Sequence, residues 1–101
     1  MRVYISGPIS GDPHYVEKFA RAAALLKRRG IEYVNPAWLP SVAPGLSWAD
    51  YMKLDLKLID LCDAIMFLKG WASSAGCCKE AVYAKSKGLP VYHLYEGRLT
   101  E

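Results

Sequence analysis

The sequence predicts a single α/β domain, spanning residues 1–101, with a parallel β-sheet of four to five strands. Two observations lead to this fold class. Short apolar runs rich in β-branched and aromatic residues alternate with longer segments of helical periodicity. Two of these runs also end in loops of small residues that lead directly into a helix. Because strands separated by helices are joined by right-handed crossovers, the alternation favours parallel strands covered by helices.

The composition is that of an ordinary globular protein. Hydrophobic residues make up 52% of the chain and charged residues 23%, which excludes a disordered polypeptide. The net charge of +3 is spread along the chain, and its only cluster is Lys27–Arg29. Three basic residues at the end of a helix complement the helix dipole, so we expect no polymeric nucleic acid as a partner.

The cysteine pattern and the N-terminus indicate where the protein works. Cys62, Cys77 and Cys78 do not form a disulfide framework, because a bridge between adjacent cysteines is strained. No signal peptide, lipidation motif or long apolar stretch is visible. We therefore expect a cytoplasmic protein with no membrane partner.

The first predicted unit is a strand, a loop and a helix. Arg2–Ile5 is the strand, and the loop that follows is bounded by glycines. A helix over Pro13–Arg29 is indicated by Asp12 as its N-cap and by the glycine at position 30. Helical spacing predicts that its buried residues are Val16, Phe19, Ala20, Ala23 and Leu26.

A second strand and a long loop come next. Ile31–Asn35 is apolar enough for a strand, and Pro36 closes it. Three prolines and a glycine between Pro36 and Leu46 predict a loop, with Trp38 and Leu39 packed against the body.

The next helix begins after Ser47, which forms a capping box with Asp50. Asp55 lies at the centre of its apolar face. An unpaired buried carboxylate costs several kcal/mol, so Asp55 should have partners or a function. The predicted buried face of this helix consists of Trp48, Tyr51, Met52, Leu58, Ile59 and Cys62.

The last predicted elements surround Glu80. A strand over Ala64–Leu68 leads through a small-residue loop into a helix over Ala75–Lys87, and Val91–Tyr95 is the fourth strand. No element is predicted for residues 96–101. Ser73 or Ser74 can cap the helix, whose first backbone N–H groups would attract an anion. Glu80 is on the packed side of this helix, which is unusual for a carboxylate.

Ligands bind beyond the carboxyl ends of parallel strands, so Tyr4, Glu80 and the loops at Gly7 and Gly70 should meet at one edge. Two inward carboxylates beside small-residue loops suit glycoside chemistry, in which one attacks or shields the anomeric carbon and the other handles protons. A structural role, with both carboxylates hydrogen-bonded to backbone or tyrosine hydroxyls, is an equal alternative.

Other candidate features support simpler interpretations. Gly7 and Gly76 suit turn and cap positions, and neither loop matches a dinucleotide or Walker fingerprint. The two histidines are isolated, so we expect no metal site and no cofactor. Trp71 could stack on a base, but a tryptophan in such a loop more often covers the core.

The motifs resemble the nucleoside 2-deoxyribosyltransferase superfamily, in particular its small phage and prophage members. The resemblance covers nearly the whole chain and implies a flavodoxin-like, Rossmann-like three-layer sandwich. Its most specific part is the Ser-x-Gly-x-x-x-Glu block. The matching residues are the stretch Val3–Gly11, then Asp55 and Asp63, then Gly70-Trp71 with Ser74, Gly76 and Glu80.

The resemblance implies a role for each catalytic residue. Glu80 would be the nucleophile on C1′ of the deoxyribose, Tyr4 would position it, and Asp55 would assist with protons or sugar hydroxyls. It also implies that substrate contacts come from Gly7, Pro8, Ile9 and Ser10 in the first loop and from Gly70, Trp71, Ser74 and Gly76 in the second.

The implied activity is cleavage or transfer of the N-glycosidic bond of a deoxynucleoside or its 5′-monophosphate. A serine at position 74 matches the branch that hydrolyses monophosphates and would contact the phosphate. Pro8 and Ser10 stand where that branch has a phosphate-binding serine and arginine. The family completes its pocket from a neighbouring subunit, which implies a homodimer or larger oligomer. The alternative is a nucleotide-binding module without turnover, acting as a sensor or sequestering protein.

Overall fold

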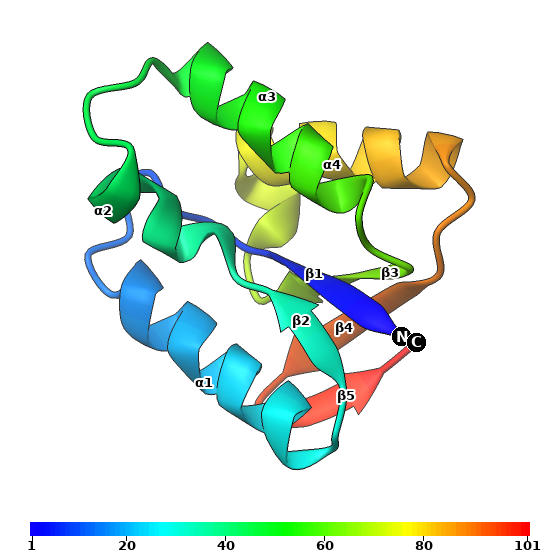
Figure 1. Cartoon of the computed structure of the whole chain (residues 1–101). Coiled ribbons are helices and arrows are strands. Elements are labelled where there is room, and N and C mark those ends of the chain that lie inside the picture. The colour runs from blue at the N-terminus through cyan, green and yellow to red at the C-terminus, as the bar shows by residue number, and fades with distance from the viewer.

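The computed structural model describes all 101 residues as three layers, with a five-stranded sheet between helices (Figure 1). The strand order is β2-β1-β3-β4-β5. Strands β1 to β4 pair in parallel, whereas β5 is antiparallel to β4. The strands are β1 (Arg2–Ser6), β2 (Glu32–Val34), β3 (Ala64–Leu68), β4 (Val91–Tyr95) and β5 (Arg98–Thr100).

The helices cover the two faces of the sheet unequally. Helix α1 (Tyr15–Arg28) covers one face, and α3 (Trp48–Ile59) and α4 (Ala75–Ser86) cover the other (Figure 1). A short helix, α2 (Leu39–Val42), and the 3₁₀ turns η1 (Pro36–Trp38) and η2 (Trp71–Ser73) lie in the connections. None of the helices has the length and apolarity needed to cross a bilayer.

The core has two parts because side chains alternate across the strands. Val3 and Ile5 of β1 point toward α1 and pack with Phe19 and Leu26. Tyr4 points the other way and packs beneath α3 and α4 with residues of β3. All five residues of β3 are buried, as expected for a central strand covered on both faces.

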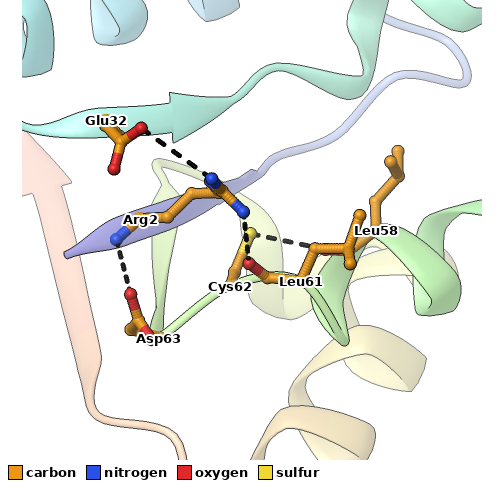
Figure 2. A network of polar contacts seen from close by, with 6 residues as sticks. All are labelled: Arg2, Glu32, Leu58, Leu61, Cys62 and Asp63. Carbon is orange, nitrogen blue, oxygen red and sulfur yellow. Dashed lines mark hydrogen bonds and ion pairs between the residues drawn. The ribbon is translucent and has the colours of Figure 1, made fainter.

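Polar contacts hold the amino ends of β1 and β3 in register (Figure 2). The backbone N–H of Arg2 donates to Asp63 Oδ2 at 2.8 Å, and its guanidinium donates to the Leu61 carbonyl at 3.0 Å. The same guanidinium lies 3.8 Å from Glu32. These contacts connect β1 to β2 and to the turn after α3, at the end of the sheet away from the small-residue loops.

Several sequence predictions need correction. Helix α1 begins at Tyr15 and not at Pro13, because Asp12 Oδ1 accepts a hydrogen bond from the N–H of His14 and forms a turn before the helix. Val16 and Ala20 are exposed, and Ala22 is buried in their place.

The region from Pro36 to Leu46, predicted as a loop, contains two short helical elements. Asn35 Oδ1 accepts from the N–H of Ala37 and starts the 3₁₀ turn η1, which continues into α2. Leu39 packs as predicted, but Trp38 is 47% exposed. Trp48 is equally exposed, and Leu58 is only half-buried.

Candidate active site

A cleft of about 560 Å³ lies at the carboxyl ends of β1 and β3. Its walls come from the loop after β1, the start of α4, the inner side of α3 and the segment around α2. The lining residues that carry the argument below are Gly7, Ser74, Trp48, Asp55, Cys77 and Glu80. Asp55 and Glu80 are the only charged side chains in the lining.

Glu80 is held at the wall of the cleft by two hydroxyl groups from β1. Tyr4 Oη donates to Glu80 Oε2 at 2.5 Å, and Ser6 Oγ donates to Glu80 Oε1 at 2.7 Å. Tyr4 and Ser6 are two residues apart in a strand, so both side chains point to the face that α4 covers. Glu80 is only 5% exposed. The predicted contact between Tyr4 and Glu80 is confirmed.

Asp55 extends from α3 toward the Glu80 carboxylate. It is 8% exposed, and its buried Oδ1 atom has no hydrogen-bond partner. Burial, the charge of Glu80 and a hydrogen bond to Glu80 together raise the pKa of Asp55 to about 8. A proton on Asp55 provides the donor that the carboxyl pair lacks.

Burial also raises the pKa of Glu80, while hydrogen bonds from Tyr4, Ser6 and Asp55 lower it. Burial is the largest of these effects, so the pKa of Glu80 is raised overall. Burial and the nearby carboxylates hold the pKa of Tyr4 well above its usual range, so its hydroxyl remains a donor. The proton shared by the two carboxyls is better placed on Asp55, because two hydroxyl donors stabilise the Glu80 anion, whereas Asp55 Oδ1 has no donor.

Most of the predicted contact residues do line the cleft. They are Gly7, Pro8, Ile9 and Ser10 from the first loop and Gly70, Ser74 and Gly76 from the second. Ser74 Oγ caps α4 by accepting from the N–H of Cys77 at 3.3 Å. A Cβ atom at Gly7 would lie 2.9 Å from Leu68 Cδ1, so this glycine allows β1 and β3 to approach closely.

Trp71 is not in the cleft. Its ring stacks on Phe67 with centroids 4.3 Å apart, and His93 lies 5.9 Å away. This packing supports the interpretation of Trp71 as a cover on the core, and stacking of its ring on a base stays a prediction.

Two features of the cleft were missed in the sequence. Ser6 contacts Glu80, and its two-residue spacing from Tyr4 was the signal that could have identified it. The apolar wall was missed because Leu39 and Leu46 come from a region with no periodic pattern, and Trp48 was assigned to the buried face of its helix. No group of three or more His, Cys, Asp or Glu side chains is arranged to hold a metal ion.

The fold is that of the nucleoside 2-deoxyribosyltransferases. The 2-deoxyribosyltransferase of Bacillus psychrosaccharolyticus matches with a TM-score of 0.70 over 92% of this chain and 71% of that protein, at 17% identity. The 2-deoxyribosyltransferase of Leishmania mexicana matches with a TM-score of 0.70 over 92% of this chain and 63% of that protein, at 20% identity. At these identities the likeness establishes the fold alone.

Sequence comparison identifies the family. No curated protein matches the chain at a significant level. A family model described as "Domain of unknown function (DUF4406)" matches residues 1–93, from β1 into β4. The chain therefore belongs to the DUF4406 family.

Proposed function

We propose that the protein cleaves or transfers the N-glycosidic bond of a deoxynucleoside or a deoxynucleoside 5′-monophosphate, with Glu80 as the nucleophile. The observation that carries this proposal is the buried Glu80 carboxylate, which accepts hydrogen bonds from Tyr4 and Ser6 beside the second carboxyl of Asp55. Such a pair supplies both a nucleophile and a proton donor, the two groups that a retaining glycosidase requires.

In the first step a Glu80 oxygen attacks C1′, and the bond between C1′ and the base nitrogen breaks. The electron pair of that bond goes to the base, which takes a proton from Asp55. This step leaves a glycosyl ester on Glu80 and an ionised Asp55. The raised pKa of Asp55 supports this role, because an ordinary aspartate would carry no proton at neutral pH.

In the second step water or another base attacks C1′ from the opposite side. Asp55 accepts the proton that the incoming group loses, and the ester bond to Glu80 breaks. Two displacements at one carbon retain the original configuration. Tyr4 acts as a positioning residue, because its hydroxyl donates to Glu80 Oε2 and is not in the cleft lining.

The lining favours an aromatic base on one side and a sugar near the carboxyls. Leu39, Leu46 and Trp48 form an apolar wall that suits a planar ring. A 5′-phosphate would bind at the start of α4, because the N–H groups of Ala75 and Gly76 have no intrahelical acceptor and are free to donate to it. Both solved relatives carry the name 2-deoxyribosyltransferase, and the Bacillus enzyme is described as a biocatalyst for nucleoside synthesis.

The test is incubation with a panel of deoxynucleosides and their 5′-monophosphates, alone and with a second free base. Chromatography should detect released base, and a new nucleoside would indicate transfer. A 2-fluoro-2-deoxy nucleoside, which slows breakdown of the ester, should add one glycosyl mass at Glu80. Binding of the panel without any released base or adduct would reject the enzyme and support the binding module.

A further inference from the structure

Ser6 is the last residue of β1 and pairs in register with Phe67 of β3. It is 1% exposed and is not part of the cleft lining. A buried serine hydroxyl needs a partner, and this one donates its only proton to Glu80 Oε1. The proposed reaction assigns no step to Ser6.

The two hydroxyls of β1 hold opposite oxygens of one carboxylate. Tyr4 donates to Oε2 and Ser6 donates to Oε1. The last torsion of a glutamate side chain has broad preferences, so a single donor would leave the carboxylate plane free to rotate. Donors on both oxygens fix that plane, and both come from one central strand that is buried along most of its length.

The surroundings of Ser6 keep its proton directed at Glu80. The thiol of Cys77 contacts Ser6 and Ser74, and burial raises the pKa of this thiol above its usual value. Cys77 therefore stays protonated at neutral pH and does not compete as an anion for the Ser6 hydroxyl.

We propose that Ser6 is a positioning residue, which fixes the orientation of the Glu80 carboxylate for attack at C1′. The inference rests on the proposed function for the attack itself, but the contact between Ser6 and Glu80 can be tested without turnover. Removal of the hydroxyl would leave Oε1 buried with no donor from β1 and would raise the pKa of Glu80 further, because hydrogen bonds to a carboxylate favour its charged form.

The experiment compares Ser6→Ala and Ser6→Thr with wild type. Ser86→Ala is the matched control, because Ser86 donates to the Tyr83 carbonyl at the exposed end of α4. The Glu80 carboxyl is titrated by ¹³C NMR, and kcat and KM are measured on any substrate that the panel identifies. Ser6→Ala should raise the Glu80 pKa by about one unit and lower kcat by roughly tenfold or more with little change in KM. Ser6→Thr, which keeps the hydroxyl, should have the Glu80 pKa and the kcat of wild type.

The outcomes separate this inference from the proposed function. An unchanged Glu80 titration in folded Ser6→Ala overturns the positioning role, whatever the enzyme does. A shifted titration in a protein that cleaves no nucleoside keeps the contact and rejects the reaction. If Ser6→Ala does not fold, Ser6→Cys is used in its place, because a thiol is a weaker donor than a hydroxyl. A Glu80 titration in Ser6→Cys equal to that of wild type would overturn the positioning role of Ser6.

Discussion

The carboxyl group of Glu80 is subject to two opposing effects at the scale of a single residue. Removal from water favours its neutral form, whereas hydroxyl donors on both oxygens favour the anion. Asp55 shifts this balance, because it holds the proton and so relieves the repulsion between two buried charges. The division of roles between the two acids follows from their neighbours and not from their residue types.

Glu80→Gln should bind ligand and lose turnover by at least about a thousandfold. The amide keeps the size of the side chain but cannot attack C1′. Calorimetry measures binding, and chromatography of the released base measures turnover. Glu17→Gln, on the exposed face of α1, is the matched control. Wild-type turnover in Glu80→Gln would exclude Glu80 as the nucleophile.

The pH dependence of stability should reveal Asp55. Its pKa is about 3.9 in an unfolded chain and about 8 in the folded protein. Between those values the folded protein binds more protons than the unfolded chain, so the free energy of unfolding decreases as the pH rises. Asp55→Asn removes this titration, so its Tm relative to wild type should rise from pH 5 to pH 8.5.

Thermal unfolding at the two pH values measures this effect. Asp50→Asn, an exposed change in the first turn of the same helix, should give a nearly constant Tm difference. A constant difference for Asp55→Asn as well would show that Asp55 titrates like an ordinary aspartate.

At the scale of elements, the sequence predicted what local chemistry determines. The cap of α3 at Ser47 and the cap of α4 at Ser74 are confirmed, because each is a hydrogen bond between residues three apart. Strand β5 was missed because its hairpin with β4 turns at Glu96 and Gly97, both with positive φ, and Glu-Gly is a weaker turn signal than Asn-Gly or Asp-Gly. Similarly, the partners of Glu80 come from β1, 74 and 76 residues away, so spacing along α4 could not identify Ser6.

Ser74→Ala should weaken binding of a monophosphate more than binding of the matching nucleoside. The serine hydroxyl lies at the start of α4 and adds a donor to the N–H groups there. The lost cap should also lower stability by about 1 kcal/mol. Ser47→Ala removes the equivalent cap of α3 outside the cleft lining, so it should lower stability without selective loss of the monophosphate. Equal loss of both ligands in Ser74→Ala would place the phosphate elsewhere.

Gly7→Ala should destabilise the fold by about 1–3 kcal/mol, because the added methyl group would overpack against buried Leu68. Gly76→Ala is the control, because a Cβ atom there would lie at ordinary contact distance, 3.5 Å from Met52 Sδ. Its urea midpoint should be equal to that of wild type or higher. Urea titration of both variants measures the difference. Equal midpoints would show that β1 and β3 can move apart without cost.

For the whole molecule, the distribution of apolar surface is informative. Trp38 and Trp48 are each 47% exposed and lie on or beside the cleft wall. Val82 is 72% exposed on α4. Large apolar side chains on so small a body favour contact with another copy of the chain.

The protein should self-associate at micromolar concentration, and Trp38→Ser should weaken the association. Trp38 lies in the segment that forms one wall of the cleft, where a second subunit would complete a shared pocket. Sedimentation velocity over a range of concentrations measures the equilibrium. Val16→Ser, an exposed apolar change on α1, should leave the equilibrium unchanged. A wild-type monomer throughout that range would contradict the prediction.

The antiparallel strand β5 has a consequence for how copies of the chain can meet. Both edges of the sheet are three-residue strands that begin with a charged residue, Glu32 in β2 and Arg98 in β5. Without β5, the five-residue β4 would present a longer row of unpaired backbone groups, and such edges recruit further strands into aggregates. Short charged edges oppose this growth. Strand β5 therefore covers the longer edge of β4, which directs assembly to side-chain surfaces and away from cross-β polymerisation.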